Sequence, residues 1–146
     1  MEYLVILFRL LLPLVALYAF WRGTRDERLV AAICVAGAIV SKLVVSPFDE
    51  RYMAVEPAIM AVDTLMLVAF IYIALNSKRF WPLWIAGLQL TTIFGHVLMA
   101  VSSDLIPKAY GMALGFWAYP IIFILAIATW RSAKWKTKRG DEALLR

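Results

Sequence analysis

Apolar residues run along this chain in five long segments, and the short stretches between them hold most of the charges and turn-forming residues. The segments lie at about 3–21, 29–45, 57–75, 80–101 and 110–130. Each is about 17 to 22 residues long, which at roughly 1.5 Å per helical residue matches the hydrocarbon core of a bilayer. The segments are continuously apolar and do not alternate, which favours helices over barrel strands. The pattern therefore predicts an all-α integral membrane bundle of five transmembrane helices.

The composition agrees with this pattern. The chain has 146 residues, of which 64% are hydrophobic and 17% charged, whereas a soluble domain is about half apolar and about a quarter charged. The connections are too short to hold a soluble domain. We therefore expect a membrane bundle over residues 1–130 and a basic cytoplasmic tail over 131–146. The single cysteine, Cys34, excludes an intrachain disulfide and a cysteine metal cluster.

The basic residues predict the orientation of the bundle. Lys and Arg gather in the first and third connections and in the tail, whereas the second and fourth connections carry only Arg51 and Lys108. Because basic connections stay in the cytoplasm, five spans place the N-terminus outside and the C-terminus inside. The tryptophans at the predicted cytoplasmic ends are Trp21, Trp81, Trp84 and Trp130. An interfacial belt of this kind supports the same orientation.

Ionisable side chains interrupt four of the apolar segments, and alternate threading brings them to one layer beneath the outer surface. They are Arg9, Lys42, Asp63 and His96. Because a charge inside a bilayer is costly, such residues usually face the bundle interior and pair. We expect Arg9 to pair with Asp63, and Lys42 and His96 to line an outward-facing polar pocket. The structural alternative is that Arg9 and Lys42 snorkel to the headgroups.

A polar stripe runs along the segment at 80–101. Gln89, Thr92 and His96 follow i, i+3, i+7 spacing and share one helix face. Such a stripe either joins two helices or lines a cavity, and a lone histidine is more often a packing residue than a ligand. The predicted ligand-binding residues are therefore Arg9, Lys42, Asp63, Gln89, Thr92 and His96.

Small residues predict close helix contacts. Gly87 and Gly95 lie on one face of their segment, and Gly111 and Gly115 form a GxxxG motif in the next. Because small residues let helices approach closely, we expect a homo-oligomer or a hetero-complex through these glycines. The basic tail is explained by attraction to membrane lipids with anionic headgroups, so no nucleic-acid partner is predicted.

Three functions remain open, because no nucleotide-binding, metalloprotease, metal-ligand or hydrolase motif occurs in the sequence. The first is binding or transport of a small ligand or a proton. The net positive charge of Arg9, Lys42, Asp63 and a neutral His96 suits a small anion. The second is a non-catalytic accessory subunit of a membrane complex. The third, least favoured, is a lipid-acting enzyme with Asp63 and His96 as acid and base. No cofactor, metal or catalytic residue is predicted.

Two stretches of the chain are distinctive. They are KRFWPLWIAGLQLTTIFGHVLMA at 78–100 and DTLMLVAFIYIAL, which begins at Asp63. Both resemble segments of small multi-span inner-membrane proteins of proteobacteria that have no assigned activity. The resemblance covers most of the chain and implies a multi-pass protein of the inner (cytoplasmic) membrane. It implies nothing about a substrate.

Overall fold

The computed structural model is helical throughout most of the residues that it describes, which are 2–44, 57–101 and 116–144. The helices are α1 (Glu2–Arg22), α2 (Arg25–Val44), α3 (Pro57–Asn76), α4 (Trp81–Val101) and α6 (Ala118–Leu144). No strand occurs in these residues, so the predicted all-α class is confirmed. Helices α1, α3 and α4 begin and end within one residue of three predicted apolar segments. The start of the segment at 110–130 lies outside the described residues.

Helices α1 and α2 are joined by two residues, Gly23 and Thr24. The amide of Gly23 donates to the carbonyl of Ala19 at 2.9 Å and so closes the last turn of α1. A Cβ on Gly23 would overlap that same carbonyl oxygen, and therefore the tight turn requires glycine. The short connection makes α1 and α2 an antiparallel pair.

The start of α2 differs from the prediction. The apolar pattern places it at Leu29, whereas the helix begins at Arg25. The cause is one of the two bonds of a capping box, in which the amide of Thr24 donates to Oε2 of Glu27 at 2.8 Å. The polar residues before Leu29 thus form the first helical turn instead of a loop.

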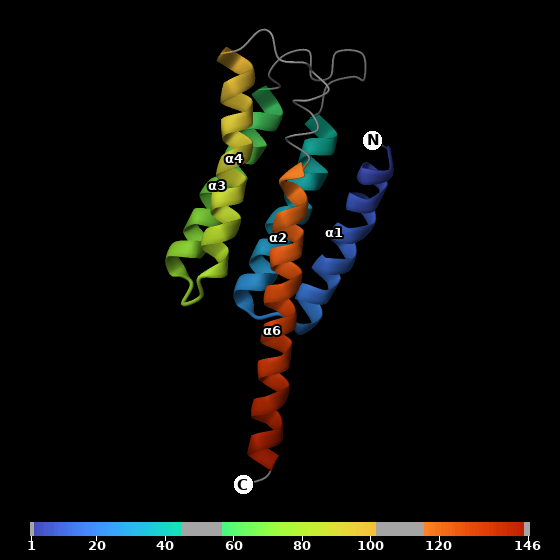
Figure 1. Ribbon diagram of the computed structural model, residues 1–146, viewed down its shortest axis with the longest axis vertical. Coiled ribbons are helices and arrows are strands. Elements are labelled where there is room, and N and C mark those ends of the chain that lie inside the picture. Colours follow the sequence, from blue (N-terminus) through green and yellow to red (C-terminus); the bar gives the residue numbers. More distant parts are fainter. Residues whose placement is uncertain (1, 45–56, 102–115, 145–146) are drawn as a thin grey trace.

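Alternating chain directions place both short turns at one end of the bundle (Figure 1). Helix α2 packs on α1 and α3, α3 packs on α4, and α6 closes the arrangement against α1, α4 and α2. The N-terminus lies at the opposite end from the turns, and α6 extends past them to the C-terminus (Figure 1). We name the end that holds the α1–α2 and α3–α4 connections the turn end.

All five described helices contribute to one apolar core. Its buried members are Leu12, Ala16, Ala19, Val30, Ala31, Cys34, Phe70, Ile73, Ile85, Ala86, Ile121, Ile122 and Leu125. Within the described part of the chain, two helices, α3 and α4, are long and apolar enough to cross a membrane. Helix α2 carries acidic and basic residues in its first turn, and α6 continues through the basic tail to Leu144. The five-span arrangement therefore stays a prediction.

Candidate functional site

Asp63 on α3 is the centre of a polar cluster with α4. Nε2 of Gln89 donates to Oδ1 of Asp63 at 3.0 Å and to its backbone carbonyl at 3.3 Å. Nε2 of His96 lies 2.9 Å from Oδ2 of the same carboxylate. The side chains of His96 and Asp63 are 1% and 17% exposed. Three of the predicted site residues thus form one largely buried group, which we name the α3–α4 cluster (Asp63, Gln89 and His96).

The predicted polar stripe on α4 does form a single buried face. Gln89, Thr92 and His96 are all buried, and two of them bond to the neighbouring helix. The contacts therefore favour the role of joining helices over the role of lining a cavity. The cluster offers one imidazole hydrogen-bonded to a carboxylate and one amide that donates to the same carboxylate.

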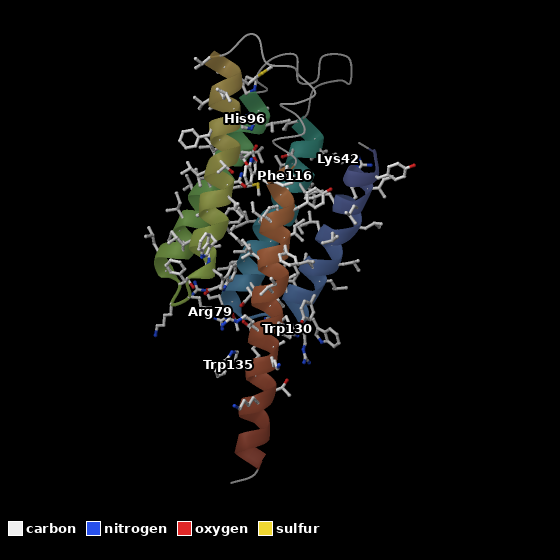
Figure 2. The ribbon with its side chains drawn as sticks, in the orientation of Figure 1. Lys42, Arg79, His96, Phe116, Trp130 and Trp135 are labelled. Carbon is white, nitrogen blue, oxygen red and sulfur yellow. The ribbon has the colours of Figure 1, made fainter. Side chains whose placement is uncertain are left out.

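Arg9 and Lys42 do not belong to this cluster. Both side chains are exposed. Lys42 lies towards the same end of the bundle as His96 (Figure 2) but makes no hydrogen bond to the cluster in the described residues. Among the described residues, the carboxylate of Asp63 contacts His96 and Gln89 and forms no ion pair with Arg9. The predicted Arg9–Asp63 pair is therefore wrong. The reason is topological, because α1 packs on α2 and α6 while Asp63 faces the adjacent α4.

A second polar cluster lies at the turn end, where the sequence predicted none. Glu27 is completely buried and accepts hydrogen bonds from Ser132 Oγ at 2.6 Å and Arg79 Nη1 at 2.5 Å. Thr24 bonds to the other carboxylate oxygen through its amide and its hydroxyl, and Arg79 also donates to Ser132. This turn-end cluster (Thr24, Glu27, Arg79 and Ser132) joins the start of α2, the α3–α4 connection and α6.

The environment keeps Glu27 ionised. Burial by itself raises the pKa of this carboxyl, but the hydrogen bonds from Ser132 and Thr24 outweigh it and hold the pKa below its usual 4.5. The Arg79 side chain, which is 40% exposed, supplies the opposite charge. A neighbouring bond from Ser77 to Asp26, at 2.6 Å, ties the same connection to α2.

One signal for the turn-end cluster is present in the sequence. Residues 24–27 read TRDE, the Thr-x-x-Glu spacing of a capping box, which places Glu27 in the first helical turn. The sequence does not predict which residues Glu27 pairs with, because Arg79 and Ser132 lie 52 and 105 residues from it along the chain.

A cavity of about 690 Å³ opens beside the turn-end cluster. It is lined by Thr24, Arg79, Phe80, Trp81, Ile124, Ile127, Ala128, Arg131, Ser132, Trp135 and Lys136. Three of these residues are basic and none is acidic. Figure 2 shows Arg79 and Trp135 at this end and His96 at the other. This turn-end cavity therefore lies opposite to the predicted pocket, and neither Asp63 nor His96 lines it.

Two further details define the turn-end cavity. The indole Nε1 of Trp81 is the one buried side-chain nitrogen or oxygen in the described residues that has no hydrogen-bond partner. Nζ of Lys136 donates to the carbonyl of Gly23 at 3.0 Å, which holds this cation beside the end of α1. A second cavity of about 590 Å³ shares Thr24 and Lys136 and adds Arg25 and Arg28. Basic side chains thus surround this end of the bundle.

The predicted glycine contacts are only partly described. Gly87 is exposed, and a Cβ added to it would meet no atom within 4 Å. This glycine therefore makes no close helix contact with the described part of the chain. Gly95 is partly buried, and Gly111 and Gly115 lie outside the described residues. No group of three His, Cys, Asp or Glu side chains among residues 2–44, 57–101 and 116–144 is placed to hold a metal ion.

Comparisons of the chain with protein-family models, with curated proteins and with solved structures gave no match. The resemblance to small inner-membrane proteins therefore stays a prediction. The geometry of the two polar clusters and of the turn-end cavity is the basis on which a function can be proposed.

Proposed function

We propose that this chain is a multi-pass protein of the inner membrane that binds a small anionic ligand in the turn-end cavity. In this proposal the chain crosses the bilayer five times, with its N-terminus outside and its turn end in the cytoplasm. The observation that carries it is a cavity of about 690 Å³ lined by Arg79, Arg131 and Lys136 and by no acidic residue. That volume lies within the usual range of ligand sites.

The membrane location is supported by the outer surface of the bundle. Each helix exposes large apolar side chains, among them Leu17 at 68%, Ile39 at 56%, Leu65 at 70%, Phe94 at 65% and Phe123 at 65%. Monomeric soluble proteins rarely expose contiguous apolar surface on this scale. Lipid is the solvent that such a surface requires, and helices satisfy their own backbone hydrogen bonds there.

The anionic character of the ligand follows from the charge balance of the cavity. Glu27 already offsets the charge of Arg79 at 2.5 Å. Arg131 and Lys136 have no carboxylate partner among the described residues, and Lys136 bonds to backbone carbonyls. Two positive charges are therefore left for a ligand, and the proposed site moves from the predicted outer layer to the cytoplasmic end.

Binding of inorganic phosphate tests this proposal. In a neutral detergent at low salt, phosphate should raise the thermal midpoint of the wild type. The Arg131→Ala/Lys136→Ala variant should lose most of that rise. The matched control, Lys134→Ala/Lys138→Ala, removes the same charge from the same helix but leaves the cavity lining intact. If neither phosphate nor an anionic headgroup binds in a way that depends on Arg131 and Lys136, the proposal fails.

An accessory subunit is the second candidate function, and the exposed Gly87 favours it. On α4, Leu83, Leu90 and Phe94 share the face of this glycine by helical spacing and are also exposed, at 53%, 44% and 65%. A small residue within an apolar face lets a second helix approach closely. A Gly87→Leu variant should then lose a partner that co-purifies in equal amount with the wild type. Equal recovery of that partner with both proteins would exclude this face as the contact.

A further inference from the structure

We infer that the occupant of the turn-end cavity is a membrane phospholipid with an anionic phosphodiester headgroup, a ligand class that rests on the proposed function. Its phosphate lies between Arg131 and Lys136, and its acyl chain follows α6 towards the bundle centre. Three arguments support this ligand: the order of residues along α6, the level that the proposed topology gives them in the bilayer, and the unpaired charges of the cavity.

One face of α6 changes from apolar to basic along its length. The lining residues from this helix are Ile124, Ile127, Ala128, Arg131, Ser132, Trp135 and Lys136. Their spacing of three and four residues places them on a single face. At about 1.5 Å per residue, the first basic side chain lies roughly 10 Å along the helix from Ile124. A ligand that fills the cavity therefore meets hydrocarbon at one end and positive charge at the other.

The point on α6 where the lining changes from apolar to basic residues coincides with the proposed membrane boundary. Trp130 marks the predicted end of the fifth span, so Ile124 and Ile127 lie within the hydrocarbon and Arg131 lies at the headgroups. Trp130 and Trp135 are 56% and 63% exposed near this level, as interfacial tryptophans are. A lipid brings its chain and its phosphate to these same two levels, whereas a soluble anion leaves the apolar half of the lining without a partner.

The charges of the cavity favour a particular headgroup. Arg131 and Lys136 line it, and neither has a carboxylate partner among the described residues. A headgroup with a net negative charge therefore satisfies these two cations better than a zwitterionic one.

Native mass spectrometry of delipidated protein tests this inference. The protein in a neutral detergent is titrated with phosphatidylglycerol or with phosphatidylcholine of the same chains. Phosphatidylglycerol should bind more tightly, and Arg131→Ala/Lys136→Ala should weaken its binding by about 30-fold, because both basic contacts are lost. Binding of phosphatidylcholine should change little. The Lys134→Ala/Lys138→Ala control should keep the preference for phosphatidylglycerol. Equal affinity of the wild type for the two lipids, or an equal loss in the Lys134→Ala/Lys138→Ala control, overturns the inference.

The water-soluble headgroup separates this inference from the proposed function. Glycerol phosphate should compete with phosphatidylglycerol only at concentrations about 100-fold higher or more, because it lacks the chain that fills the apolar half. If glycerol phosphate binds as tightly as the lipid and still depends on Arg131 and Lys136, the lipid inference fails and anion binding stands. If neither ligand depends on these residues, both proposals fail.

Discussion

The two polar clusters lie at different levels of the bundle and are built in different ways. The α3–α4 cluster joins two helices that follow each other in the chain, through one carboxylate with Gln89 and His96. The turn-end cluster joins three segments far apart in the sequence, through Glu27 with Arg79 and Ser132. The first is a local joint between antiparallel neighbours, whereas the second depends on the closure of the whole bundle.

Their surroundings differ as well. The α3–α4 cluster lies within the two described helices that could cross a membrane. Interhelical hydrogen bonds in such helices contribute modestly, because the separated helices also find polar partners. The turn-end cluster holds a full ion pair beside a basic cavity, with Glu27 buried and Arg79 partly exposed. We therefore expect the turn-end cluster to be more important for stability.

The largest effect is expected from Arg79→Ala. This change leaves the buried carboxylate of Glu27 without a counter-charge. Because the Arg79 side chain is 40% exposed, solvent screens the pair, and the free energy of unfolding should fall by about 2 kcal/mol. Equilibrium unfolding in mixed micelles measures it. The matched control is Lys78→Ala, at the neighbouring position in the same connection, which should stay within about 0.5 kcal/mol of the wild type. Equal losses for the two variants would show that the ion pair contributes nothing specific.

A double-mutant cycle measures the α3–α4 cluster. The pair Asp63→Asn and His96→Gln should show a coupling of about 1 kcal/mol, as hydrogen bonds between membrane helices do. The pair Arg9→Ala and Asp63→Ala should be additive to within about 0.5 kcal/mol, because the two residues do not touch. Coupling of Asp63 with Arg9, and none with His96, would restore the Arg9–Asp63 pair and contradict the observed contacts.

The pH dependence of stability tests whether Glu27 is ionised in the folded protein, with Glu27→Gln as the neutral comparison. The pKa of Glu27 is lower in the folded state than its usual value of 4.5. The ionised carboxylate therefore stabilises the folded protein at pH values above 4.5. This contribution is lost as the pH falls through the pKa that Glu27 has in the folded state. The stability gap between wild type and Glu27→Gln should therefore narrow on acidification below about pH 4.5. A gap that is constant down to acidic pH would exclude an ionised Glu27.

The smallest effects on stability are expected at two glycines, Gly37, which faces a neighbouring helix, and Gly87, which is exposed. A Cβ on Gly37 would overlap Sδ of Met66, but a methionine side chain can move, so Gly37→Ala should cost only about 1 kcal/mol. Gly87 has open space around it, and Gly87→Ala should change stability by less than about 0.5 kcal/mol. Unfolding of the two variants in the same detergent checks this order.

Much of the α3–α4 cluster could be predicted, because its residues are close along one helix or in adjacent helices. Helical spacing placed Gln89 and His96 on one face, and antiparallel α3 and α4 bring Asp63 against that face. The partner of Asp63 was mispredicted, because depth in a membrane does not say which helices are neighbours. Arg9 has a suitable charge and depth, but its helix packs elsewhere.

The sequence by itself determined the helical class, most of the helix ends and the alternating chain directions, because these depend on apolar run length, turn residues and charge along the chain. Only the tertiary structure decided that Glu27 is buried and that the basic residues of α6 meet Arg79 around a cavity. The physical reason is that an ion pair or a cavity forms between surfaces. Which surfaces meet depends on the packing of all the helices together, and no spacing along one helix contains that information.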